Sequence, residues 1–459
     1  MAKKSSAIKY DVIVIGSGVA GSNSALLAAQ AGRSVALIES GQLGGASANY
    51  SDIPISVFAR AAGTFENAKN ASRLGLRAET ISYNFPSIKL FKDQAIKASQ
   101  VTSPVFYQKR GVDVIRGRAQ FINQQTVSVD GEHYQAAKFI IATGAKWRLP
   151  KVSGLDQVKY FTPDTLINIP RPPRSLFVIG GDKAGLEVAQ IMASFGTKVF
   201  VTSIAARLLP DYDEEVGDFI EQTITSKNRM IVSTSSRVTS IARDQRGWRV
   251  KFNHAGLDKE IIVEQILIAG DKEPDTDLGL ENAGVEYDSS GIKVNGQLQT
   301  TNRSIFACGA VINPKSEGSH IANYESGVAI NNLLRLSKTL AADYSLMPRL
   351  VKATPAIASI GLSEDDCNRQ SIDHRTALAN LRESPYSLVA PEENGFVKLV
   401  ANSRRQIIGA TVVSPQAETI IHELLLIIRA EMTAKELLNL PRTFLSVNEL
   451  IAIAAEKLL

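Results

Sequence analysis

The sequence predicts an α/β chain with two parallel-sheet units and a C-terminal α+β region. Two observations predict the sheet units: the apolar runs at 12–15 and 176–179 are each followed by a glycine-rich turn and a stretch with helical spacing. A third observation concerns the chain after about residue 350. There, short β-like runs alternate with amphipathic helical stretches (395–400, 407–413, 417–430 and 447–458).

Length and composition indicate a globular protein of about three domains. The chain has 459 residues, of which 44% are apolar and 21% are charged, so a disordered chain, a coiled coil and a fibre are excluded. Its formal net charge of +5 is too small to indicate a nucleic-acid partner. No uninterrupted apolar stretch reaches the roughly 18 residues of a membrane span, and we see no signal peptide. We therefore expect a cytoplasmic protein.

Cysteine and histidine usage excludes two further classes. Only Cys308 and Cys367 are present, so there is no disulfide framework, and neither lies in a C-x-x-C spacing. We expect both to be buried small hydrophobes. The five histidines are scattered and form no metal-binding pattern, so we expect no metal site.

The first unit carries a dinucleotide-binding fingerprint. Gly16, Gly18 and Gly21 have the G-x-G-x-x-G spacing between a strand and a helix. The first glycine permits a sharp turn, the second lets a pyrophosphate approach the backbone, and the third lets the helix pack on the strand. Glu39, at the end of the next strand, occupies the place of an acid that binds an adenosine ribose. The alternative is a glycine-rich turn in an ordinary α/β domain.

The second unit has the same design but a damaged fingerprint. Its spacing gives Gly180, Asp182 and Gly185, so the middle glycine is an aspartate. A carboxylate there adds bulk and repels a pyrophosphate. The segment before this unit, IPRPPRS, is rich in proline and is predicted to be a linker.

Over nearly its whole length the chain resembles the pyridine nucleotide-disulfide oxidoreductases, the family of dihydrolipoamide dehydrogenase and mercuric reductase. The resemblance implies an FAD-binding domain, an NAD(P)-binding domain, a central domain that completes the FAD site and a dimerisation domain, in a homodimer. The boundaries that it implies are 1–148, 149–275, 276–345 and 346–459. The matching segments are DVIVIGSGVAGSNSALLAAQAGRSVALIE, Gly44-Gly45, IIATGA (140–145), VIGGDKAGLEVA (178–189), DLGLENAGV (277–285), IFACGA (305–310), TPAIASIGLSE (354–364) and NGFVKLV (394–400).

The resemblance also extends the cofactor site beyond the fingerprint. It implies FAD contacts from the residues that follow the first unit and from the central domain. In Gly309-Ala310 the family usually has an aspartate in second place, so one charge-assisted hydrogen bond of ~1.5–3 kcal/mol is expected to be missing. The implied FAD residues, besides Gly16, Gly18, Gly21 and Glu39, are Ser40, Gly45, Ser47, Ala119, Ala142, Thr143, Gly144, Gly309 and Ala310.

The catalytic parts of the family are missing. Its two redox cysteines would fall at Ser47 and Asp52, and its following lysine at Ser56. Serine and aspartate cannot form a thiolate or a mixed disulfide. The histidine that serves as acid and base for the thiols is replaced by Phe444, which carries no proton, and Glu449 is left as an interface or helix residue.

Glu187 occupies the family's glutamate position and is our candidate catalytic residue. With serine at residue 56 we expect it to have lost its lysine partner and to have a raised pKa. It is then either a proton relay beside the flavin or a water-solvated remnant.

Nicotinamide binding is doubtful. The candidate residues are Gly180, Gly181, Gly185 and Ser203, where Ser203 replaces the ribose-binding acid of an NAD site. Arg207 is a possible cation for the 2′-phosphate of NADPH, and Lys183 partly offsets the charge of Asp182. The sequence does not choose between NADH and NADPH.

Three functions remain open. The first is a flavoenzyme that passes electrons from NAD(P)H through FAD directly to a quinone-like or other small acceptor, since the flavin carries the chemistry. The second is a catalytically inert FAD-binding dimer that acts as a scaffold or sensor. The third is a disulfide reductase with an unrecognised thiol, which the residue types disfavour.

Overall fold

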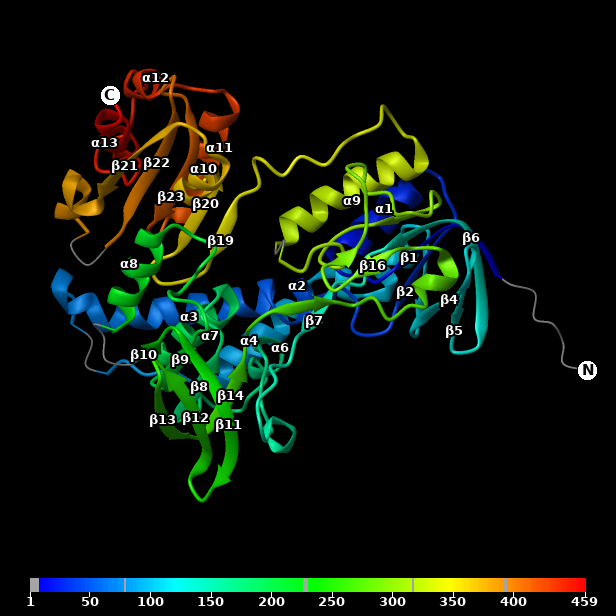
Figure 1. Cartoon of the computed structure of the whole chain (residues 1–459), viewed down its shortest axis with the longest axis horizontal. Helices are drawn as coiled ribbons and strands as arrows, with labels where there is room; N and C mark the ends of the chain where they lie inside the picture. The colour runs from blue at the N-terminus through cyan, green and yellow to red at the C-terminus, as the bar shows by residue number, and fades with distance from the viewer. Residues whose placement is uncertain (1–7, 78–79, 226–229, 316–317, 391–393) are drawn as a thin grey trace, which may run out of the picture.

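The computed structural model describes residues 8–77, 80–225, 230–315, 318–390 and 394–459. The chain is a mixed α/β protein, as predicted (Figure 1). It has a first sheet that is parallel at its centre and antiparallel at one edge, a second, parallel sheet and a separate C-terminal sheet. The proposed boundaries after residues 148, 275 and 345 stay predictions.

The first sheet is parallel at its centre because its strands are apolar on both faces. β1 (Ile8–Ile15) lies between β2 (Val35–Glu39) and β6 (Glu132–Ile141), and Val12, Ile13 and Val14 are completely buried. Helices α1 (Val19–Gln30) and α9 (Ser319–Leu334) contact one another beside this sheet. The strand order is β3 (Val112–Arg116), β2, β1, β6, β5 (Thr126–Val129) and β4 (Ala119–Asn123), with β18 (Ile305–Ala307) also paired to β6.

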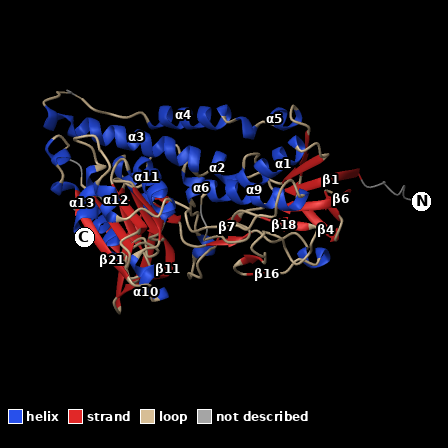
Figure 2. Ribbon diagram, turned by 90° about the horizontal axis from the view of Figure 1, so that it is seen from above, coloured by secondary structure: helices blue, strands red, loops and turns tan. Residues whose placement is uncertain are grey.

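A helical segment between β2 and β3 of the first sheet packs against the second unit. α3 (Asp52–Asn70) and α4 (Phe85–Ala98) pack against each other, and α3 also packs on α7 of the second unit. Both helices run along one side of the molecule in Figure 2. The buried face of α3, with Ile55, Phe58 and Ala62, belongs to the same apolar core as Leu186 of α7. Two short helices adjoin this segment: α2 (Gly45–Asn49) and α5 (Pro104–Gln108).

The second sheet repeats the design of the first. Its order is β10 (Met230–Ser233), β9 (Lys198–Thr202), β8 (Ser175–Ile179) and β14 (Gln265–Ile268), all parallel. Helix α7 (Lys183–Ser194) follows β8 directly. The remaining elements around this unit are β7 (Ala145–Trp147), α6 (Pro163–Leu166), α8 (Glu214–Thr225), β11 (Ser236–Asp244), β12 (Gly247–His254), β13 (Leu257–Val263) and β15 (Lys272–Pro274). The short strands β16 (Tyr287–Asp288) and β17 (Gly291–Ile292) lie beside the first sheet, and Ile292 belongs to its apolar core.

The C-terminal region is an antiparallel sheet covered by helices. Its strand order is β19 (Arg349–Val351), β20 (Ile357–Gly361), β23 (Ile407–Val413), β22 (Phe396–Asn402) and β21 (His374–Asn380). The helices are α10 (Glu364–Gln370), α11 (Ala417–Arg429), α12 (Ala434–Leu438) and α13 (Glu449–Lys457). The predicted α+β character of this region is confirmed.

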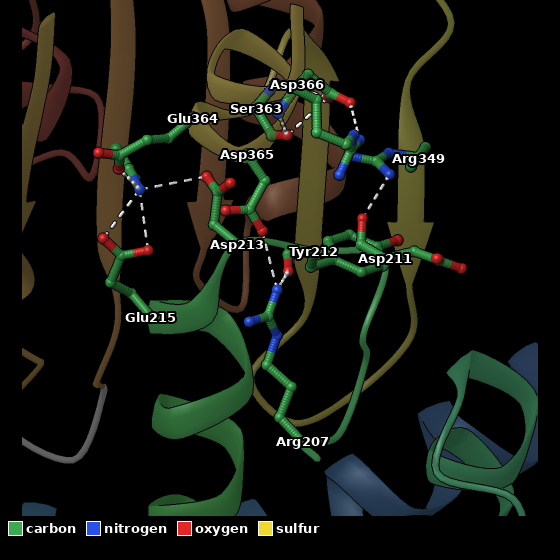
Figure 3. A network of polar contacts seen from close by, with 12 residues as sticks. Arg207, Asp211, Tyr212, Asp213, Glu215, Arg349, Ser363, Glu364, Asp365 and Asp366 are labelled. Carbon is green, nitrogen blue, oxygen red and sulfur yellow. Dashed lines mark hydrogen bonds and ion pairs between the residues drawn. The ribbon is translucent and has the colours of Figure 1, made fainter. Parts of the chain in front are cut away.

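A buried charge network joins the C-terminal sheet to the second unit (Figure 3). Lys398 of β22 is 3% exposed in its side chain, and its Nζ lies 2.9 Å from Glu215, 2.5 Å from Glu364 and 3.4 Å from Asp213. Beside it, Arg207 donates to Asp365 at 2.9 Å. These contacts fasten the loop before α8 to the N-terminal end of α10.

Candidate functional site

A cavity of about 480 Å³ lies at the carboxyl edge of the first sheet and reaches α7 of the second unit and the end of β19. Its lining includes most of the predicted FAD residues. They are Gly16, Gly18, Glu39, Ser40, Gly45, Ser47, Ala119, Ala142, Thr143, Gly144, Gly309 and Ala310. Gly21 lies behind the glycine turn and does not line the cavity.

The glycine turn has the close backbone approaches that its spacing suggests. Gly16 has φ +96°, and a Cβ added to it would lie 2.3 Å from the carbonyl oxygen of Ala142. A Cβ on Gly21 would lie 1.8 Å from the carbonyl oxygen of Gly16, so helix α1 rests directly on the turn. Gly18 is the N-cap of α1, and a Cβ on it would meet open space. The backbone N–H groups that begin α1 are therefore accessible from the cavity.

A second glycine brings another segment against this helix end. Gly45 begins α2 with φ +60°, and a Cβ there would lie 2.5 Å from the Cα of Gly18. Only two residues without side chains permit this approach. The resulting cradle of backbone groups fits the pyrophosphate of a dinucleotide.

Glu39 is held in a fixed orientation at the end of β2. Its Oε2 accepts hydrogen bonds from the N–H and the hydroxyl of Ser17, at 2.8 and 2.6 Å, and its Oε1 accepts one from the N–H of Gly41 at 2.6 Å. Glu39 lines the cavity beside the glycine turn, because Ser17 lies between Gly16 and Gly18. This is the arrangement that a ribose-binding acid requires.

Ser47 and Asp52, which we expected at the thiol positions of the family, belong to a hydrogen-bonded polar cluster. The hydroxyls of Ser47 and Ser319 both donate to Oδ2 of Asp52, the former at 2.8 Å, and Nζ of Lys352 lies 3.7 Å from Oδ1. Burial opposes the charge of this carboxylate, but the two hydroxyls and the nearby Lys352 and Lys183 hold the pKa of Asp52 below its usual range.

Both cysteines lie outside this cluster. Cys308 and Cys367 are free and completely buried, as we expected for small hydrophobes. Burial raises the pKa of each thiol, so neither readily becomes a thiolate. Among the residues that the structure describes, no cysteine lines the cavity.

Glu187 is hydrogen-bonded, but its partner is a backbone N–H and not a lysine ammonium group. Its Oε1 accepts a hydrogen bond of 2.7 Å from the backbone N–H of Lys352. The residue is 7% exposed, so it is not a water-solvated remnant. Burial raises the pKa of Glu187, in the predicted direction, against the opposing effect of Lys183 and Lys352.

The second fingerprint has the same packing as the first but lies away from the cavity. A Cβ on Gly180 would lie 2.2 Å from the carbonyl oxygen of Ala269, and one on Gly185 would lie 2.3 Å from that of Gly180. Gly181 packs against Ser203, with 2.7 Å from an added Cβ to the serine Cβ. Asp182 is the N-cap of α7, the position that Gly18 holds in α1. The carboxylate thus sits at the helix end where a phosphate would bind.

The predicted nucleotide-binding side chains are engaged within the protein. Ser203 is buried, and its hydroxyl accepts from the N–H of Ala205 at 3.2 Å. Arg207 donates to Asp365 and to the carbonyl oxygen of Tyr212, so the possible 2′-phosphate partner already holds an ion pair. In the cavity lining, helix α7 contributes Lys183, Ala184, Glu187 and Val188, and the segments beside it contribute Pro163, Asp164, Lys272 and Asp275.

Phe444 lies on the surface of the C-terminal region. It is 77% exposed and does not line the cavity of this chain. Glu449 instead accepts from the N–H of Leu445 at 2.8 Å and from the hydroxyl of Ser384 at 2.7 Å. It thereby fixes the loop that carries Phe444, and the non-catalytic role of both residues stays a prediction.

Sequence reasoning missed Ser319 and Lys352. Both line the cavity and contact Asp52. Neither lies within a recognisable motif, so no sequence pattern marked them as site residues. In the part of the chain that the structure describes, no cluster of His, Cys, Asp and Glu could hold a metal ion, and no helix has the length and apolar character of a membrane span.

Comparison with known proteins agrees with the family resemblance found in the sequence. Residues 10–327 match the family Pyridine nucleotide-disulphide oxidoreductase, and residues 347–453 match its dimerisation domain. The chain is 30% identical to mercuric reductase of Staphylococcus aureus over 451 residues, 97% of this chain and 82% of that protein. It is 31% identical to dihydrolipoyl dehydrogenase of Geobacillus stearothermophilus over 460 residues, 98% of this chain and 96% of that protein.

A solved structure shares the fold. The HOCl-induced flavoprotein disulfide reductase RclA from Escherichia coli superimposes with a TM-score of 0.84 at 23% identity, over 97% of this chain and 99% of that one.

Proposed function

Because the chain belongs to the pyridine nucleotide-disulphide oxidoreductase family, we propose that it is an FAD-dependent oxidoreductase that passes electrons from NAD(P)H to a small, quinone-like acceptor without a dithiol. Members of this family bind FAD and use NAD(P)H. Flavin, when bound, supplies the redox chemistry itself. The overall reaction balances as NAD(P)H, a proton and a quinone giving NAD(P)⁺ and a hydroquinone.

The observation that carries this proposal is the polar cluster at the thiol positions. Ser47 donates to Asp52 at 2.8 Å where a disulfide reductase needs two sulfurs. The chain keeps the glycine cradle and Glu39, which would hold the FAD pyrophosphate and ribose. Retention of the cofactor site with loss of the thiols favours direct transfer to an acceptor.

The chain's own residues would serve the reaction by charge and by exclusion of water. Glu187 is buried at the cavity wall, and burial raises its pKa, which favours the protonated form of its carboxyl group. Asp52 stays ionised, and its Oδ2 already accepts from two serine hydroxyls. We assign Glu187 as the candidate proton-holding residue. The dimerisation domain supports a homodimer.

The experiment that tests this function is an acceptor survey with the FAD-loaded protein. We expect NADH or NADPH oxidation with a water-soluble quinone and none with lipoamide or oxidised glutathione. The double variant Cys308→Ser/Cys367→Ser should keep the quinone activity. Turnover of a disulfide that this variant loses would contradict the proposal and restore the disulfide-reductase alternative.

A second candidate is a catalytically inert FAD-binding dimer. The specific observation that favours it is Asp182 at the N-terminus of α7, since its negative charge opposes a nucleotide phosphate there. Arg207, held by Asp365, adds to this argument against NADPH. In that case the protein would bind FAD, and neither nicotinamide would reduce it.

A further inference from the structure

Lys352 lies where three parts of the chain meet at the cavity. It directly follows strand β19, and its backbone N–H donates to Glu187 of α7 at 2.7 Å. Its ammonium group donates to the hydroxyl of Ser56 in α3 at 2.7 Å and to the carbonyl oxygen of Asp52 at 3.4 Å. One residue of the C-terminal region therefore binds both helices that flank the cavity.

The ammonium group of Lys352 contacts the serine at residue 56. Residue 56 is where the resemblance leads one to expect a lysine, and here it is a serine. The cation that contacts this serine comes from a residue 296 positions further along the chain. A positive charge is thus present at this place, but it is supplied by a different element.

The charges around this cation are nearly balanced. Asp52 and Glu187 line the same end of the cavity, and Lys183 and Lys352 act on both carboxylates. His320 of α9 interacts electrostatically with Lys183 and Asp52. Its Nε2 lies 2.8 Å from the carbonyl oxygen of Pro348. Removal of the Lys352 charge would leave two carboxylates against a single lysine, in a cavity where charges are weakly screened.

We propose that Lys352 is a positioning residue that supplies, from the end of β19, the positive charge that Ser56 lacks, and that this charge favours the reduced form of the bound flavin. The inference rests on the proposed function, because it requires FAD in the cavity. A nearby cation stabilises the electron density that reduction adds, so its loss should make reduction harder.

The test is the reduction potential of bound FAD, measured anaerobically against redox dyes. In Lys352→Met we expect about a tenfold smaller equilibrium constant for two-electron reduction, which is a potential about 30 mV more negative. The backbone hydrogen bond to Glu187 does not depend on the side chain, so it should persist. Lys352→Arg keeps the charge and should stay near the wild-type value.

The decisive variant is the double substitution Lys352→Met/Ser56→Lys. Because the Ser56 hydroxyl contacts the Lys352 ammonium, a lysine at 56 should return the charge to the same place and restore the potential. Lys293→Met is the matched control, since Lys293 also pairs with a carboxylate, Asp288 at 2.5 Å, but lies away from the cavity. It should leave the potential unchanged.

The outcomes separate the two proposals. A wild-type protein that binds no FAD overturns the proposed function and this inference together. A wild-type protein with bound FAD, and a Lys352→Met potential equal to it, overturns the inference alone. A shift that Ser56→Lys does not reverse also overturns it, because the effect would then be structural. If Lys352→Met does not fold, the same comparison is made with Lys352→Gln.

Discussion

At the residue scale, the site is defined by the polar cluster around the Asp52 carboxylate. Ser47 and Asp52 form a hydrogen bond rather than a redox pair, and Ser319 and Lys352 complete the cluster around the carboxylate. The Asp52 carboxylate is thus a negative charge held in place by two hydroxyl donors. Such a group can shape the electrostatics of the cavity but cannot exchange electrons with a disulfide.

Asp52→Asn is predicted to lower stability at neutral pH but not in acid. The pKa of Asp52 is below its usual value of 3.8, so its stabilisation is present above that value and is lost as the pH falls through the folded-state pKa. Since the side chain is 44% exposed, we expect a loss of only about 1 kcal/mol at pH 7. Chemical unfolding at pH 7 and pH 3 measures it. An equal loss at both pH values would contradict the assignment.

Glu187→Gln is predicted to have the opposite pH dependence. Burial raises the pKa of Glu187 above its usual value of 4.5, so the folded state binds more protons than the unfolded state. The wild-type protein therefore loses stability as the pH rises from the unfolded-state pKa of this group to its folded-state pKa. The variant lacks this cost. Its stability relative to wild type should therefore increase between pH 4 and pH 8, as read from melting temperatures. A constant difference would show that Glu187 titrates normally.

At the element scale, sequence patterns predicted the local elements well. The glycine turns, the strand at 407–413 and the helix near 417–430 were found as predicted because each depends on local periodicity. The role of α3 was not predicted. Its buried residues, such as Phe58, pack on α7 of the second unit, and this long-range contact leaves no local signal.

The N-terminus of α7 gives a prediction about nucleotide binding. Asp182→Gly removes a negative charge from the helix end, so we expect the Kd for NADH or NADPH to fall about tenfold, or about 1.4 kcal/mol. Asp182→Asn separates charge from size, because it removes only the charge. Calorimetric titration of all three proteins is the measurement. Equal affinities would mean that Asp182 does not limit binding.

At the scale of the whole molecule, the charge network of Lys398 holds the C-terminal region on the second unit. Lys398→Met leaves the buried Asp213 and two partly exposed glutamates without their cation, so we expect a loss of about 3 kcal/mol. Lys293→Met removes an exposed ion pair and should leave the melting temperature nearly unchanged. Thermal unfolding compares them. Similar melting temperatures for both variants would contradict the role of this network.

The whole site could be predicted only in part. The FAD fingerprint and the absence of the thiols follow from motifs with fixed spacing, and most of these residues line one cavity. The partner of Glu187 could not be predicted, because Lys352 reaches Ser56 and Glu187 only through the packing of distant segments. A contact of this kind, between residues 296 positions apart, leaves no local signal in the sequence.

The central claim is that FAD in this protein works without a dithiol, and an anaerobic reductive titration tests it most directly. We predict that the flavin band of the FAD-loaded protein is fully bleached by two electrons per FAD and that a quinone restores it. Uptake of four electrons per FAD, with restoration by a disulfide substrate, would reveal a redox-active cysteine pair and contradict the account.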